Sequence, residues 1–159
     1  MTLAEKKKMF FQTITSTAPG MDDQETPTGE ILKIHLLTEV IMEHLILAVF
    51  GEEHGKAIIS LELTYSKKLI LCSGCKLDCG RGLLSSDVIG SLKKLNSLRN
   101  SFAHKLGKSL SDEEVENLFV GQLGKDRDSS QKNIPLFNKL IMYKTRIHCH
   151  MLDFDPANV

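Results

Sequence analysis

The sequence predicts an all-α protein whose helices form a bundle in a single domain. Apolar residues recur at every third or fourth position between residues 30 and 50, as on one face of a helix. No stretch alternates apolar and polar residues for long, as a half-buried strand would. The chain has 159 residues, of which 42% are hydrophobic, so it is long and apolar enough to bury one core.

Residues 1–29 are expected to precede the main domain as a short helix and a linker. Residues 3–15 could form the helix, with one methionine and two phenylalanines as its apolar anchors. Residues 17–29 hold two prolines and two glycines among small and acidic residues, which is typical of a linker. The main helical domain is therefore expected to comprise residues 30–159.

Two long helical stretches should open this domain. The first is expected to be capped by Thr28 and to end at Gly51, because glycine commonly stops helices. The second should run from Lys56 toward Cys72, with a break near Leu63. A segment rich in glycine and cysteine follows, and it predicts a turn.

The next helix should begin at Ser86 or Asp87, since either side chain can cap a helix. It is expected to run to about Leu106, and Gly107 should end it. The polar side of this helix carries the residues whose chemistry is most informative.

Two shorter helices are expected near the end of the chain. Ser111 and Glu114 have the spacing of a capping box, which predicts a short helix through Leu123. Residues 125–133 are polar and should form a loop. A last helix is expected over residues 135–151, where apolar residues return at helical spacing.

Three residues of the helix that Gly107 ends could act together on a phosphodiester. Arg99 has a permanent charge and a planar fork of donors that suits phosphate. His104 can accept or give a proton near neutral pH. Asn100 and His104 are four positions apart, so they share a face of the helix. This set could bind and cleave a phosphodiester with no metal ion or other cofactor.

The pattern of Arg99, the polar Asn100 and then His104 after four intervening residues resembles the motif of the HEPN superfamily of small helical domains. The chain also resembles HEPN proteins related to the mannitol operon repressor in the order of three segments. These are residues 63–70, the Gly-Leu-Leu segment at residues 82–84, and then the helix that carries the motif. The resemblance covers residues 30–123, and it implies a HEPN-like helical bundle.

The resemblance implies a metal-independent RNA endonuclease. His104 would be general base for a 2′-hydroxyl or general acid for the leaving oxygen, and Arg99 would hold the scissile phosphate. Asn100 would orient the histidine or contact the phosphate. Arg99 and His104 are about 140° apart on an ideal helix, so one chain brings them together poorly. HEPN proteins pair two motifs across a two-fold cleft, so a homodimer is expected.

Other roles for these residues remain open. Arg99 could pair with Glu39 or Glu43 on the first long helix, and His104 could stabilise the end of its own helix. The resemblance also allows a non-catalytic dimer that regulates or scaffolds a partner protein. Some HEPN toxins carry a tyrosine two positions after the histidine, but Leu106 occupies that position here. If the protein is a toxin or defence effector, its antitoxin would be a separate protein.

The net charge is zero, but charge is distributed unevenly along the chain. Residues 22–63 contain nine acidic and two basic residues, whereas residues 64–108 contain nine basic and two acidic residues. A local basic face can attract RNA even when net charge is zero, although it could equally balance the acidic helix beside it. The residues expected to contact RNA are Lys93, Lys94, Lys105 and Lys108.

The cysteines give only a weak metal signal. Cys72, Cys75 and Cys79 have the spacing C-x2-C-x3-C, without the second cysteine or histidine pair of a typical zinc site. Residues at these positions would also share the inner face of a helix, so no metal site is expected. The sequence shows no secretory signal, and its longest apolar run, Leu45–Phe50, is too short for a bilayer. A cytoplasmic protein that does not bind membranes is expected.

Overall fold

The computed structural model describes residues 26–76, 80, 82–105 and 107–152. Helices dominate this part of the chain and it contains no strand, so the predicted all-α class is confirmed. The short helix expected at residues 3–15, and most of the linker after it, lie outside the described residues.

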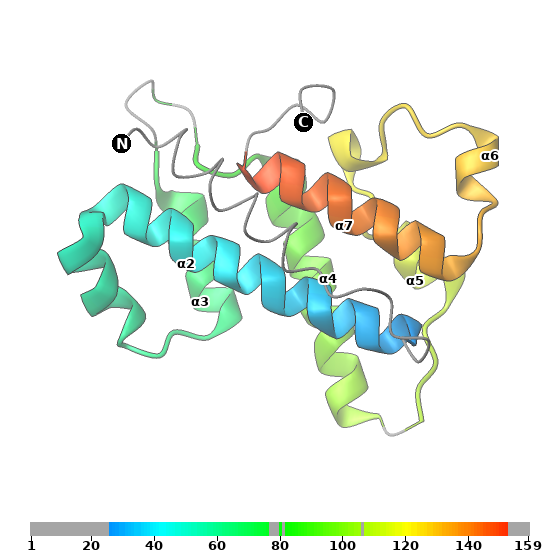
Figure 1. Ribbon diagram of the computed structural model, residues 1–159, viewed down its shortest axis with the longest axis horizontal. Helices are drawn as coiled ribbons and strands as arrows, with labels where there is room; N and C mark the ends of the chain where they lie inside the picture. The colour runs from blue at the N-terminus through cyan, green and yellow to red at the C-terminus, as the bar shows by residue number, and fades with distance from the viewer. Residues whose placement is uncertain (1–25, 77–79, 81, 106, 153–159) are drawn as a thin grey trace.

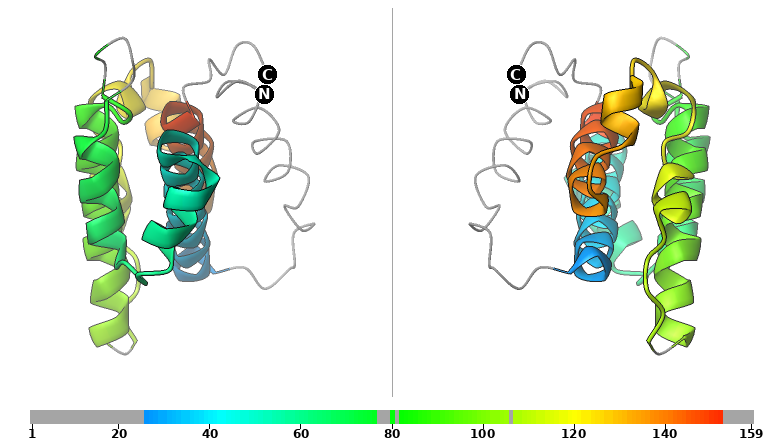
Figure 2. Two further views of the ribbon diagram at one scale, coloured as in Figure 1. Left: turned by 90° about the vertical axis from the view of Figure 1, so that its left-hand side faces the viewer. Right: turned by 90° about the vertical axis from the view of Figure 1, so that its right-hand side faces the viewer.

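Four longer helices and three short ones follow in order along the described chain (Figure 1). Figure 2 shows α2 and α7 side by side in one layer, with α4 in a second layer. The helix α3 packs against both α2 and α4. The elements are α2 (Pro27–Ile59), α3 (Tyr65–Gly74), α4 (Ser86–His104), α5 (Asp112–Glu116), the 3-10 helix η1 (Gly121–Gly124), α6 (Ser129–Lys132) and α7 (Leu136–Leu152).

The helix α2 is capped by Thr26 rather than by Thr28. The Thr26 hydroxyl accepts a hydrogen bond from the Gly29 amide at 3.1 Å. Pro27 then occupies the first turn, where a missing amide hydrogen costs nothing. Thr28 therefore lies inside the helix, two positions after the residue that caps it.

A sharp kink divides α2 at Gly51, which has φ of 78° and ψ of 167°. This left-handed φ is strained for any residue with a side chain. The predicted end of the first helical stretch at Gly51 is confirmed in backbone terms, because helical geometry resumes only after it. The second part folds back closely: a Cβ atom added to Gly55 would lie 2.8 Å from the Cα atom of Leu47. Glycine is therefore required at both positions.

The helix α4 is capped by Ser85 rather than by Ser86 or Asp87. The Ser85 hydroxyl accepts from the Val88 amide at 3.3 Å. The carboxylate of Asp87 instead accepts from the amide of Gln122 at 3.0 Å, far along the chain. Because Asp87 makes this contact with a distant residue, it does not cap the helix on which it lies.

The capping box at Ser111 and Glu114 is confirmed, but the helix that it opens is shorter than expected. It ends at Glu116, and the chain turns before the separate helix η1. Gly121 has φ of 50°, and a Cβ atom there would lie 2.4 Å from the carboxylate of Asp87. This close approach to α4 requires a turn where a continuous helix through Leu123 was expected. The loop expected at residues 125–133 contains one helical turn, α6.

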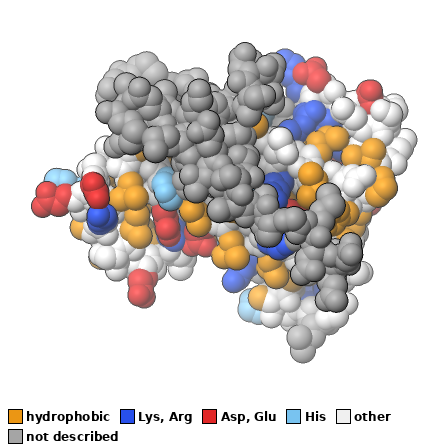
Figure 3. Space-filling model, viewed as in Figure 1, with side chains coloured by type: hydrophobic (Ala, Val, Ile, Leu, Met, Phe, Trp, Pro, Cys, Tyr) orange, Lys and Arg blue, Asp and Glu red, His pale blue; other side chains and the backbone are white. Residues whose placement is uncertain are grey.

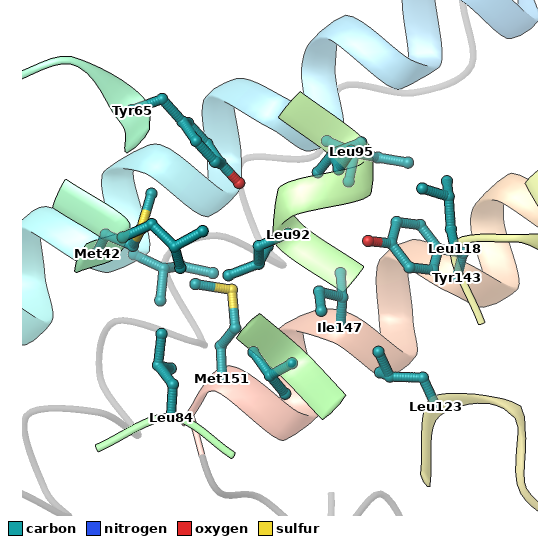
Figure 4. Packing of buried hydrophobic residues seen from close by; sticks show 14 of the residues in the cluster. Met42, Tyr65, Leu84, Leu92, Leu95, Leu118, Leu123, Tyr143, Ile147 and Met151 are labelled. Carbon is teal, nitrogen blue, oxygen red and sulfur yellow. The ribbon is translucent and has the colours of Figure 1, made fainter. Parts of the chain in front are cut away.

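The core is formed by one face from each of the longer helices. Figure 4 shows side chains converging from α2, α4 and α7, with Leu92 and Leu95 supplied by α4. A buried polar chain joins three segments within this core. The Tyr143 and Ser91 hydroxyls are 2.7 Å apart, and Ser91 donates to the Leu118 carbonyl at 2.6 Å. Because Ser91 has a single hydrogen, Tyr143 must donate to Ser91. These bonds hold α4 against α7.

Several large hydrophobic side chains remain exposed on α2. Leu32, Leu36 and Val40 are 40%, 60% and 39% exposed, and their spacing places them on one side of the helix. In Figure 3 hydrophobic side chains lie among charged ones over the described part of the visible face. Among the described helices, α2 is long and apolar enough to cross a membrane, although 39% of its most apolar window is buried in the fold. A core helix meets the same criterion.

Candidate functional site

The predicted catalytic residues lie on the outer side and at the end of α4. Leu92, Leu95 and Leu98 hold the inner face of this helix in the core. Arg99 is exposed, Asn100 is partly buried, and His104 is the exposed last residue of the helix. Anchoring by the leucines therefore turns the motif toward the surface between α4 and its neighbours.

A hollow of about 450 Å³ opens between α2, α3 and α4. Arg99 and Asn100 line it, and the Arg99 guanidinium donates to the Asn100 side-chain oxygen at 3.1 Å. His104 is not part of its lining. One chain thus brings the arginine and the amide together but leaves the predicted histidine outside. The full lining is His35, Glu39, Thr64, Tyr65, Ser66, Asn96, Arg99 and Asn100.

Arg99 does not form the ion pair that was considered for it with Glu39 or Glu43. The ammonium group of Lys68 binds both carboxylates instead, at 2.7 Å and 2.5 Å. Burial by itself would lower the pKa of Lys68, but the hydrogen bonds that it donates to the two glutamates outweigh burial and raise the pKa. Lys68 therefore stays charged, and Arg99 has no carboxylate partner among the described residues.

A second histidine occupies this hollow, and sequence analysis did not include it in the site. His35 is only 5% exposed, and its Nε2 lies 3.0 Å from the side-chain oxygen of Asn96. The Asn96 amide nitrogen donates to the Ser66 hydroxyl at 3.1 Å. The imidazole also stacks on the ring of Tyr65, with centroids 4.0 Å apart. The sequence signal that could have identified this residue is the place of a histidine among the inward-facing apolar residues of α2.

Burial is the main cause that lowers the pKa of His35 below its ordinary value. The hydrogen bond that Asn96 accepts and the charge of Glu39 act in the opposite direction, and the charge of Arg99 lowers the pKa further. The net effect favours the neutral imidazole near neutral pH. A neutral imidazole can accept a proton, so His35 has the right state for a general base.

Two further hollows continue along the outer side of α4. A hollow of about 360 Å³ shares Ser66 and Asn96 with the one around His35. It shares Lys93 and Ser97 with a third hollow of about 540 Å³. The three hollows therefore adjoin one another in a row, the α4 track, which runs from His35 to the lysines of α4.

The four lysines predicted to contact RNA differ in their surroundings. Lys93 and Lys94 are exposed and line the third hollow, and Lys105 is exposed at the end of α4. The ammonium group of Lys108 binds Glu114 at 2.5 Å and also donates to Ser101. Its charge is already paired within the chain, so Lys93 and Lys94 are the stronger candidates for a polyanion.

The described residues contain no group of three His, Cys, Asp or Glu side chains that could hold a metal ion. Cys72 is buried, and burial raises the pKa of its thiol to about 12. It is therefore a protonated thiol rather than the thiolate that binds zinc. Cys75 is partly buried, and Cys79 lies outside the described residues.

Comparison of the chain with protein-family models, with curated proteins and with solved structures finds no match. The residues that line the α4 track, and the chemistry they can perform, are therefore the basis for assigning a function.

Proposed function

We propose that this protein is a metal-independent RNA endonuclease of the HEPN type that binds RNA along the outer side of α4. The observation that carries the proposal is this row of three adjoining hollows, with Arg99 and Asn100 in the first and Lys93 and Lys94 in the last. No acidic residue occurs in the sequence between Asp87 and Asp112, so α4 presents an excess of positive charge. Such a surface favours a phosphate backbone.

The chemistry assigns a role to each motif residue. Arg99 would bind the scissile phosphate and stabilise the negative charge that grows on it. The oxygen of Asn100 accepts from Arg99, so its amide nitrogen is the atom that can donate to the phosphate. His104 would transfer a proton to or from the reacting oxygens.

A homodimer would supply the geometry that one chain lacks. His104 lies outside the hollow that holds Arg99, so a histidine from a second copy would complete each site. We infer a cytoplasmic homodimer that acts as a toxin or defence effector, with any antitoxin as a separate protein.

The exposed apolar residues of α2 favour a second candidate function. Leu32, Leu36 and Val40 recur every four residues on the helix surface and could bind a protein partner. A non-catalytic HEPN-type dimer, similar to the mannitol operon repressor, would use that surface to regulate or scaffold another protein.

Cleavage of mixed-sequence RNA by the purified chain in EDTA distinguishes the two functions. Wild type should cleave, and His104→Ala should cleave roughly 100-fold to 10,000-fold more slowly, as expected when a general acid or base is removed. Arg99→Lys should not restore the activity lost in Arg99→Ala, because lysine lacks the planar fork. Cleavage through the 2′-hydroxyl should leave 2′,3′-cyclic phosphate ends.

The matched control is His54→Ala, which changes an exposed histidine of α2 outside the track. It should cleave as wild type does. Equal cleavage by wild type and His104→Ala from identical preparations would indicate a contaminating nuclease. That result would leave the non-catalytic function as the better candidate.

Binding has its own test, which does not depend on cleavage. Lys94→Ala should weaken RNA binding and reduce its salt dependence, because one phosphate contact is lost. Lys56→Ala is the control, since Lys56 is paired with Glu52 on α2. Equal effects of the two changes on the salt dependence would contradict binding along α4.

A further inference from the structure

We propose that the hollow between α2, α3 and α4 is a phosphodiester subsite in which His35 accepts the proton of the attacking 2′-hydroxyl. The inference deepens the proposed function, because it names the base that serves the phosphate bound by Arg99. It also assigns a second histidine to the site, besides the one in the motif.

The hydrogen bonds around His35 define which ring nitrogen can act. Asn96 uses its amide nitrogen to donate to Ser66, so its oxygen faces the imidazole. A carbonyl oxygen can only accept, and Nε2 of His35 must therefore carry the hydrogen. Nδ1 then holds the lone pair of the neutral ring and is the atom that can accept a proton.

The ring is held rigidly in this orientation. It stacks on Tyr65, whose hydroxyl lies 2.9 Å from that of Thr38. Thr38 donates its one hydrogen to the His35 carbonyl at 2.9 Å, so Tyr65 must donate to Thr38. A base fixed before the substrate arrives loses little entropy when it reacts.

The titratable groups facing His35 come from three helices. Glu39 is on the same helix, Tyr65 is on α3, and Arg99 is on α4. Lys68 from α3 pairs with Glu39 and also with Glu43, so the carboxylate nearest to the hollow is already countered. Arg99 thus remains as the charged donor that can hold a phosphate beside the imidazole.

The proposed step transfers one proton and exchanges one bond at phosphorus. The proton of the 2′-hydroxyl moves to Nδ1 of His35, the bond from O2′ to phosphorus forms, and the bond from phosphorus to O5′ breaks. The departing 5′ oxygen takes a proton from a His104 imidazolium. Water then carries a proton from His35 to His104, which restores both residues.

Nitrogen NMR of the six histidines tests the subsite without requiring cleavage. The full chain is labelled on its histidine nitrogens and titrated with a short mixed-sequence oligodeoxynucleotide, which has phosphodiesters but no 2′-hydroxyl. The free protein should show His35 with its hydrogen on Nε2. The His35 signals should move on titration, those of His54 should not, and Arg99→Gln should abolish the movement of the His35 signals.

An oligonucleotide that does not bind, or that binds without moving the His35 signals, overturns the subsite. A His35 ring with its hydrogen on Nδ1 overturns the role as base. Movement of the His35 signals in a protein that never cleaves RNA supports the subsite and refutes the proposed nuclease, so the two failures are distinguishable.

For a protein that cleaves, His35→Gln tests the base directly, because glutamine can still donate to Asn96 but cannot accept the proton. Its single-turnover rate should fall by roughly 100-fold to 10,000-fold, and the acidic limb of its pH–rate profile should disappear. His54→Gln is the matched control, and urea unfolding checks that each variant is folded. A folded His35→Gln with the wild-type rate and pH profile overturns the assignment.

Discussion

The buried histidine of α7 should make the protein less stable as pH falls. His148 is 5% exposed, and its Nε2 has no hydrogen-bond partner among the described residues. Burial, with a smaller effect from the charge of Lys144, lowers the pKa of His148 from 6.5 to about 4. The unfolded chain therefore takes up a proton near pH 6.5, whereas the folded protein resists protonation until about pH 4. The neutral ring therefore makes its full contribution to the free energy of unfolding above pH 6.5, and this contribution is lost as the pH falls toward 4.

The size of the effect follows from these two pKa values. Over the whole interval the difference corresponds to about 3 kcal/mol, at about 1.4 kcal/mol for each pKa unit. Most of it, about 2 kcal/mol, should appear between about pH 7 and about pH 5, before most carboxylates titrate. His148→Leu removes both the titrating group and the unpaired buried nitrogen, so it should remove this part of the pH dependence.

Urea unfolding followed by circular dichroism at the two pH values measures the free energies of unfolding. Wild type should lose about 2 kcal/mol more than His148→Leu on acidification. His54→Gln, which changes an exposed histidine, should behave as wild type. His35 also has a lowered pKa, so some pH dependence should persist in His148→Leu. If His148→Leu and wild type lose the same free energy, the ring is not buried as described.

Two further predictions concern the packing of α4, and both are measured as free energies of unfolding in urea. Ser91→Ala should cost about 2–3 kcal/mol, because it leaves the buried Tyr143 hydroxyl unpaired and removes one of the two hydrogen bonds that the Leu118 carbonyl accepts, whereas Tyr143→Phe should cost only about 1 kcal/mol. Equal costs would contradict the assigned donors. Gly121→Ala should cost about 1–3 kcal/mol, because its φ is left-handed and its Cβ would meet the carboxylate of Asp87. Gly90→Ala should instead stabilise the protein slightly, since its Cβ would make ordinary contact at 3.6 Å; a matching loss there would contradict the argument.

The features that sequence predicted correctly depend on residues close together in the chain. The capping box of Ser111 and Glu114 forms because both partners lie within one helical turn. The break at Gly51 follows from a backbone conformation that glycine adopts without strain. Helical spacing of apolar residues likewise predicted the all-α class and the position of Asn100 on the side of α4 away from its leucines.

Contacts between distant segments decided the remaining features, and no local pattern encodes them. Asp87 binds the Gln122 amide in η1, Ser85 caps α4 in its place, and the helix that begins at Asp112 ends early. Lys68, and not Arg99, pairs with Glu39 and Glu43, because the packing of α3 on α2 brings the Lys68 ammonium group to both carboxylates.

The candidate site shows the same division. The sequence by itself determined that α4 carries an arginine, an amide and a histidine at defined angles around a helix, since helical geometry alone sets those angles. Only the tertiary structure decided which histidine shares a hollow with Arg99. The packing of α2 and α3 against α4 places His35 there and leaves His104 outside, because the start of α3 meets α2 and α4 at positions far apart in the chain.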